Sequence, residues 1–248
     1  MSGHSKWANI KHKKGKADAQ RGKIFTKIGR EIAIAVREGG GDPSTNGKLR
    51  DIVAKAKANN MPNDNIARSI KKASGEMGNV VYEEITYEGY APGGIAVIVE
   101  VVTDNRNRAA SDIRHIFDKN GGALGTTGSV GYMFDFKGLL MIERAKGVSE
   151  DELMMQALEA GAEDVQANED GFEVYTAPND FSAVRDALEA EGYVFLSADR
   201  QKIPQNYVDV PDEETLLKVQ KLLEMLDDND DVMGVYHNAN LPEEEAED

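Results

Sequence analysis

The spacing of apolar residues changes at about residue 80, and this change most limits what the chain can fold into. From Ala17 to Glu38 an apolar residue recurs at every fourth position, at Ile24, Ile28, Ile32 and Val36. This spacing is typical of one face of an amphipathic helix. After residue 80 the apolar runs are short and rich in β-branched residues, and they alternate with helical patterns. The sequence therefore predicts a helical N-terminal region followed by an α+β body.

Two further helical patterns follow the first one. One runs from Asn46 to Ala58, and the other begins at Pro62, which suits a first helical turn, and ends at Gly75. Three amphipathic helices of this length predict a compact three-helix bundle. The stretch "SGEMGN" holds two glycines, and we expect the segment from Ala73 to Val80 to be a linker.

The sequence after residue 80 predicts two α+β units, one of which is inserted in the other. "VVYEEITYEGY" and "GIAVIVEVVTD" predict a hairpin, a helix follows over 106–119, and "SVGYMFDF" predicts a third strand. From Gly138 to Ile203 the order is strand, helix, strand, strand, helix, strand, which is one ferredoxin-like unit. The segment 80–137 lacks one helix and one strand of a second four-stranded, two-helix layer. A helix in "EETLLKVQKLLEML" and a strand in "DVMGVYH" then supply these two elements.

The fold class predicted is α+β multidomain, with an N-terminal three-helix bundle and two ferredoxin-like domains, the third inserted in the second. The expected boundaries are 1–79 for a basic helical domain with an N-terminal arm, 80–137 and 205–240 for the second domain, 138–204 for the third, and 241–248 for an acidic tail.

Charge is divided unevenly between these parts. Residues 1–75 carry 17 Lys and Arg against 6 Asp and Glu, a net charge of +11, whereas the rest carries 12 against 38, a net charge of -26. A basic module joined to an acidic body favours a polyanionic partner for the basic module. The alternative is that these cations form an ordinary solvated surface.

The basic residues of the first helix are not scattered. On a helical wheel Lys23, Lys27, Arg30 and Arg37 gather opposite the apolar stripe, which predicts a line of positive charge directed away from the bundle core. The lysine-rich residues before this helix are expected to form an arm that follows a phosphate backbone. Trp7, the only tryptophan, could stack on a base, but we expect it to anchor the arm by packing against the bundle.

A second basic group lies in the acidic body. Arg106 and Arg108 stand at a helix start, where the helix dipole favours acids, and this hints at an anion or RNA contact. The alternative is that Asp104 or Asp112 pairs with them. The candidate nucleic-acid-binding residues are Lys6, Lys11, Lys13, Lys14, Lys16, Arg21, Lys23, Lys27, Arg30, Arg37, Arg106 and Arg108.

No pattern points to catalysis, a metal or a cofactor. The chain has no cysteine, and its four histidines lack the paired spacing of a zinc site. The glycine-rich "NGGALGTTGSVG" precedes a predicted strand, and its last glycines lack the lysine of a phosphate loop. We assign no catalytic, cofactor or metal residue. With no apolar run of about 20 residues and no secretory pattern, we expect a cytoplasmic protein that makes no membrane contact.

Long blocks of the sequence resemble one family. "GHSKWANIKHKKGKADAQRGKIFTKIGREI", "GGGDPSTNGKLRDIVAKAKANNMPNDNIARSIKKASG", "YEGYAPGGIAVIVEVVTDNRNRAASDIRHIFDKNGGALGTTGSVGYMF" and "GFEVYTAPNDFSAVRDALE" are similar to the YebC/PmpR family of bacterial regulators and their mitochondrial translational-activator relatives. The resemblance implies a helical N-terminal domain and two ferredoxin-like domains around a cleft. It also implies two roles, binding promoter DNA or acting on the ribosome where proline-rich stretches stall synthesis.

We therefore expect a non-enzymatic, nucleic-acid-binding regulator of gene expression, in the first place a DNA-binding transcriptional regulator. A ribosome-associated translation factor that binds RNA is the alternative, and an enzyme with an unrecognised site is a remote one. The expected partners are promoter DNA, ribosomal RNA or the ribosome, without a small-molecule substrate. Phosphate contacts carry no base identity, so the sequence leaves the target, the sequence preference, the oligomeric state and the role of the tail open.

Overall fold

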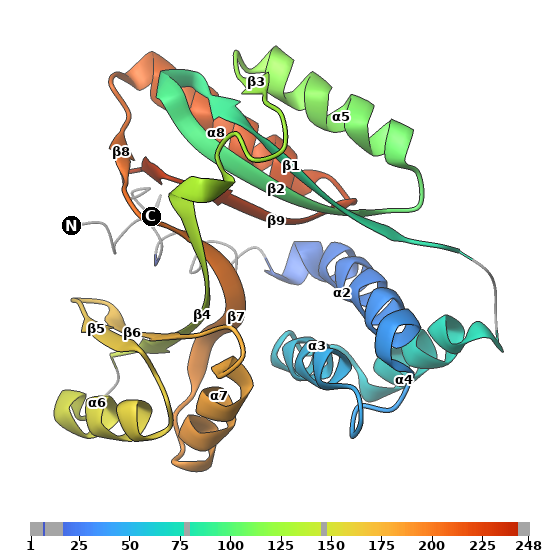
Figure 1. Ribbon diagram of the computed structural model, residues 1–248, viewed down its shortest axis with the longest axis vertical. Coiled ribbons are helices and arrows are strands. Elements are labelled where there is room, and N and C mark those ends of the chain that lie inside the picture. Colours follow the sequence, from blue (N-terminus) through green and yellow to red (C-terminus); the bar gives the residue numbers. More distant parts are fainter. Residues whose placement is uncertain (1–6, 8–16, 77–79, 145–147, 243–248) are drawn as a thin grey trace. The chain divides into compact units, whose positions relative to one another are not determined.

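The computed structural model describes residues 7, 17–76, 80–144 and 148–242 of the 248-residue chain (Figure 1). The arm lysines, residues 77–79 of the expected linker and most of the acidic tail lie outside the described residues. The chain divides into two compact units, one built on 134–207 and including Trp7, the other on 17–133 and 208–239.

Three helices form the predicted bundle at the start of the second of these units. They are α2 (Ala17–Gly39), α3 (Gly47–Ala58) and α4 (Asn63–Lys71), and a π-helical turn, Lys72–Glu76, follows α4. The core contains Ile28 and Ile32 of α2 with Leu49 of α3. Asn46 fixes the entry into α3, because its side chain accepts from the Leu49 N–H and donates to the carbonyls of Ala35 and Gly40. The three-helix prediction is confirmed.

The same unit contains an antiparallel sheet in the order β3-β1-β2-β9. Its strands are β1 (Glu83–Ala91), β2 (Ile95–Thr103), β3 (Ala123–Leu124) and β9 (Val232–His237). The predicted hairpin is present, with a 3-10 turn at Pro92–Gly94. Helices α5 (Arg106–Lys119) and α8 (Glu213–Asp228) cover one face (Figure 1). The short strands β8 (Val208–Asp209) and β10 (Ala239–Asn240) pair with each other and have no counterpart in the prediction.

The predicted third strand over 129–136 is wrong for residues 129–133, whereas residues 134–136 are strand but belong to the start of the inserted unit. Gly131–Met133 is a 3-10 turn, and the third strand of the sheet is β3, which lies before it. The cause is the carboxylate of Glu88, which accepts hydrogen bonds from the N–H groups of Gly128, Val130 and Gly131. Backbone donors used in this way are not available to a β-ladder.

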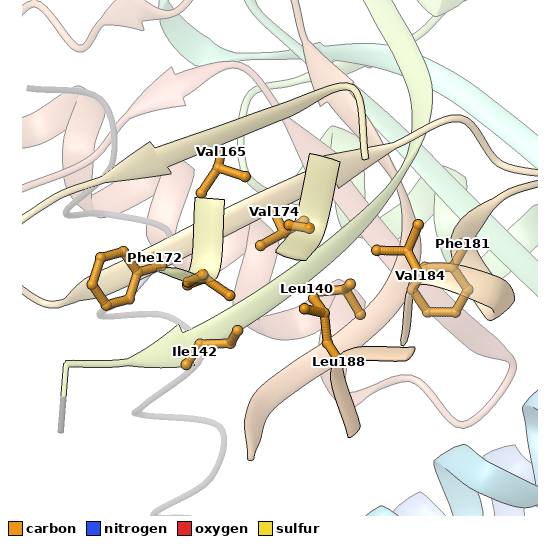
Figure 2. Packing of buried hydrophobic residues seen from close by; sticks show 10 residues of the cluster. Leu140, Ile142, Val165, Phe172, Val174, Phe181, Val184 and Leu188 are labelled. Atoms are coloured by element: carbon orange, nitrogen blue, oxygen red, sulfur yellow. The ribbon is translucent and has the colours of Figure 1, made fainter. Parts of the chain in front are cut away.

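The inserted unit has the predicted order of elements. It contains β4 (Phe134–Glu143), α6 (Glu150–Glu159), β5 (Asp164–Ala167), β6 (Gly171–Thr176), α7 (Phe181–Ala190) and β7 (Phe195–Pro204). The antiparallel sheet has the order β5-β6-β4-β7, the ferredoxin-like arrangement. Figure 2 shows Leu140 and Ile142 of β4 meeting Phe172 and Val174 of β6, with Val184 of α7 beside them. Strand β4 begins at residue 134, earlier than the predicted start at 138.

Trp7 packs on the other face of this inserted sheet and is fully buried. It forms a cluster with Leu139, Met141 and Tyr175. Its indole Nε1 donates to Glu173 at 2.9 Å, and the Tyr175 hydroxyl donates to the same carboxylate. A packing role for Trp7 is confirmed, but the expected partner, the helical bundle, is wrong. Gly171 allows this packing, because a Cβ at that position would lie 2.5 Å from the indole ring.

Candidate nucleic-acid interface

Two lysines of the basic line predicted on α2 contact another part of the same unit. Lys23 Nζ lies 3.2 Å from the Asp228 carboxylate, and Lys27 Nζ donates to the Asp227 carbonyl at 2.8 Å. Both acceptors belong to the acidic turn, which we define as residues 227–231, from the last two residues of α8 to the residue before β9. The basic line lies outside the bundle core cluster, but part of it is used by contacts with the acidic turn.

Arg30 makes the most buried of these contacts. Its Nη1 lies 2.6 Å from Asp231 Oδ1, with side chains that are 16% and 8% exposed, and it also donates to the carbonyls of Asp230 and Val102. Asp231 Oδ2 accepts from Arg108 and from the Thr103 hydroxyl, each at 2.8 Å. One carboxylate thus joins α2, the end of β2 and the start of α5 to the acidic turn.

Burial by itself would raise the pKa of Asp231. Hydrogen bonds from Arg108, Thr103 and Arg30 more than offset this effect, so the pKa of Asp231 lies below its ordinary value. The group is consequently ionised at neutral pH, and its charge is shared by two guanidinium groups. We call these contacts the Asp231 cluster.

Ile34 explains why the helical wheel misplaced this face. It stands four residues after Arg30, on the same side of α2, and is 1% exposed although it lies outside the bundle core cluster. The Arg30 guanidinium also lies 5.7 Å from the ring of Tyr82, just before β1. Helix α2 therefore buries two sides, one in the bundle and one beside the sheet. An isoleucine within the basic line was the signal in the sequence.

The two arginines at the start of α5 differ in their contacts. Arg108 pairs with Asp104 at 2.9 Å and with Asp231, so the alternative of pairing with Asp104 is confirmed for this residue. Arg106 is 69% exposed, and its Nη1 lies 3.8 Å from Glu83. A surface pair of that length contributes little to stability and leaves the guanidinium accessible.

Within the described part of the bundle, five exposed basic side chains make no hydrogen bond or ion pair: Arg37, Arg50, Lys57, Arg68 and Lys72. Arg50 and Lys57 are seven residues apart and share one face of α3. Arg68 and Lys72 are four residues apart at the end of α4 and share another. We call these five residues the open cations of the bundle. Of these five residues, only Arg37 was predicted from the sequence to bind nucleic acid.

The remaining residues predicted to bind nucleic acid are the lysines of the arm and Arg21. Lys6, Lys11, Lys13, Lys14 and Lys16 lie outside the described residues. Arg21 is exposed. By contrast, Lys48 and Lys55 of α3 are neutralised by Glu38 and Glu31, each at 3.0 Å. The positive field of α3 therefore comes from Arg50 and Lys57.

Over the ranges that the structure describes, no group of three or more His, Asp or Glu side chains is arranged to hold a metal ion. No helix in these ranges is both long and apolar enough to cross a bilayer. Among described residues, the N–H groups of the glycine-rich loop at 128, 130 and 131 already bind the Glu88 carboxylate.

Comparison with known proteins identifies the family. Residues 5–76 match the family described as TACO1/YebC protein N-terminal domain, and residues 82–239 match TACO1/YebC second and third domain. The chain belongs to the TACO1/YebC family. A probable transcriptional regulatory protein of Clostridium novyi is 62% identical over 98% of this chain and 99% of its own length.

A second relative with the same description, from Acetivibrio thermocellus, is 60% identical over 96% of this chain and 98% of its own length. The crystal structure of a conserved hypothetical protein from Aquifex aeolicus is similar in fold, with a TM-score of 0.84 and 47% identity. That match covers 94% of this chain and 96% of the Aquifex chain.

Proposed function

We propose that the chain is a non-enzymatic, cytoplasmic nucleic-acid-binding regulator of gene expression, and that the open cations of the bundle are its main phosphate contacts. The observation that carries this proposal is that these five side chains are exposed and unpaired among the described residues, whereas neighbouring lysines of α3 are neutralised. Unpaired Lys and Arg gain affinity for nucleic acid by releasing condensed counterions.

The charge of the rest of the chain also favours the bundle as the surface that binds nucleic acid. Residues 76–248 carry a net charge of -26 against +11 for residues 1–75, so the long-range field attracts a polyanion first to the bundle. Arg30 is occupied by Asp231, so it contributes to the fold rather than to phosphate binding. Lys23 and Lys27 keep only a secondary role, since both already contact the acidic turn.

The name of the relatives, probable transcriptional regulatory protein, favours promoter DNA as the target. Action on ribosomal RNA is the competing outcome, because phosphate contacts serve either polymer. The proposal includes no catalytic step, and we expect neither ATP nor GTP hydrolysis.

The test compares two matched double variants. Arg50→Glu/Lys57→Glu reverses two open cations, and Lys119→Glu/Lys221→Glu reverses two exposed lysines of the acidic body on α5 and α8. All four side chains are exposed, so circular dichroism should show both variants folded. Affinity is measured at one salt concentration on promoter duplexes and on purified ribosomes.

We expect the bundle variant to lose at least tenfold in affinity and the control to change little. Loss on a specific duplex, with discrimination over random DNA, supports the transcriptional role. Loss on ribosomes alone supports the translational one. Equal binding by the bundle variant and wild type on both targets would refute the proposal.

A further inference from the structure

A groove of about 510 Å³ lies in the same unit as the bundle, between α5, β1 and the glycine-rich loop. Its polar walls are Tyr87 of β1, Arg114 and Asp118 of α5, and Thr126 and Thr127 of the loop. This volume is within the range of sites that bind small organic ligands, which is roughly 300–1,000 Å³. Nothing in the function proposed above uses this groove.

The loop wall is held in place by a buried carboxylate. Glu88 is 7% exposed and accepts from the N–H groups of Gly128, Val130 and Gly131 at 2.7–2.8 Å. The Gly125 N–H donates to the Glu88 carbonyl at 2.8 Å. With both ends of the loop tied to one residue, the exposed Thr126 and Thr127 have a fixed position beside the groove.

The other wall supplies positive charge next to an aromatic ring. Arg114 is exposed and, among the described residues, makes no hydrogen bond or ion pair. Burial raises the pKa of Tyr87, and the positive charges of Arg114 and Arg106 act in the opposite direction. Tyr87 and Arg114 line the same groove, so a positive charge and an aromatic ring are available to one ligand.

We propose that this groove binds one nucleotide of a single-stranded nucleic acid, with its phosphate on Arg114 and the two threonine hydroxyls and its base against Tyr87. Unstacked bases bind aromatic side chains, and arginine pairs with phosphate oxygens. Asp118 would repel a bare anion, so the ligand must also bring a donor, such as a base N–H group or a ribose hydroxyl. A duplex does not fit, because its bases are stacked inside.

This inference rests on the proposed function, because it assumes that the chain meets nucleic acid. Its probes are labelled single-stranded octamers of uridine and of deoxyuridine, which differ only in the ribose 2′-hydroxyl, with binding followed by fluorescence anisotropy. Arg114→Gln should weaken octamer binding at least tenfold, a loss of about 1.4 kcal/mol or more, since it removes a hydrogen bond between a charged donor and the phosphate. The salt slope should also become shallower by roughly 0.7, the value for one phosphate on a single strand.

Three further variants distinguish direct contact in the groove from a general loss of positive charge. Lys119→Gln removes an exposed cation of the same helix that does not line the groove, and it should bind like wild type. Tyr87→Leu should weaken binding about 5- to 100-fold by loss of stacking, whereas Tyr87→Phe keeps the ring and should restore most of it. Tighter binding of uridine than of deoxyuridine octamers places Asp118 on the ribose hydroxyl. Equal binding places Asp118 on the N–H of the base, and both results support the proposed binding in the groove.

The inference is overturned if Arg114→Gln and Tyr87→Leu bind octamers like wild type, or if Lys119→Gln loses as much as Arg114→Gln. Its failure differs from failure of the proposed function. If wild type binds duplexes or ribosomes through Arg50 and Lys57 but binds no octamer, the groove proposal alone fails. If octamer binding depends on Arg114 while the bundle variant binds all targets normally, the groove stands and the bundle proposal fails.

Discussion

Replacing Asp231 by asparagine removes the one negative charge that Arg30 and Arg108 share. The variant keeps the shape of the side chain, but its amide NH₂ must face one of the guanidinium groups, which are also donors. Breaking a buried ion pair costs about 3–5 kcal/mol. Because Arg108 is 47% exposed and retains Asp104, we expect a smaller loss here, about 2–3 kcal/mol.

The assay is urea unfolding followed by far-UV circular dichroism at pH 7. With an m-value of about 2 kcal/mol per M, the midpoint should fall by about 1–1.5 M. Asp230→Asn is the matched control, because Asp230 offers Arg30 only its backbone carbonyl, which the substitution retains. Its stability should lie within about 0.5 kcal/mol of wild type.

The effect should also depend on pH. The folded-state pKa of Asp231 lies below its ordinary value, so its stabilisation is complete above the unfolded value of about 3.9 and is lost as pH falls through the folded value. Wild type and Asp231→Asn should therefore differ fully at pH 7 and converge in strong acid. If the two proteins unfold together at pH 7, the Asp231 cluster does not join the bundle to the sheet.

Two other substitutions test the contacts of Glu88 with the glycine-rich loop and the packing of Trp7 against Gly171. Glu88→Gln places an amide NH₂ against one of three backbone N–H donors, so it should lower the free energy of unfolding by about 1.5–3 kcal/mol. Hydrogen exchange at Gly128, Val130 and Gly131 should become faster. Unchanged exchange would contradict the role of Glu88 in holding this loop. Gly171→Ala should displace Trp7 and shift its fluorescence to the red, because the added Cβ meets the indole at 2.5 Å and crowds the Ile142 carbonyl. Gly22→Ala is its control, since nothing lies within 4 Å of the added Cβ. If the fluorescence spectrum of Gly171→Ala is not shifted, Trp7 does not pack against Gly171.

The sequence predicts those elements whose signals are local. Apolar spacing locates α2, and Asn46 marks the start of α3, because a helix and its cap depend on residues a few positions apart. The strand order of the inserted unit follows from the order of its elements. The false strand over 129–133 shows the limit, since Glu88, which bends that segment, lies 40 residues away from Gly128.

The candidate site was harder to predict for a related reason. A helical wheel assigns one buried side to a helix, and it cannot show that α2 buries a second side through contacts with residues about 200 positions later. The acidic run at 227–231 and Ile34 within the basic line were the available signals, and together they indicate a partner inside the chain. Arg50 and Lys57 were visible as a repeat of seven, but nothing in the sequence distinguished them from Lys48 and Lys55, which are paired.

The most direct test of the central claim is the salt dependence of duplex binding, compared between open and occupied cations. We predict that Arg50→Gln/Lys57→Gln/Arg68→Gln makes the slope of log affinity against log salt shallower by roughly 0.9 for each phosphate that the variant no longer neutralises. Lys23→Gln/Lys27→Gln, which changes two cations already engaged by the acidic turn, should leave the slope close to that of wild type. A slope unchanged in the first variant, or reduced as much in the second, would contradict the assignment of the open cations as the nucleic-acid interface.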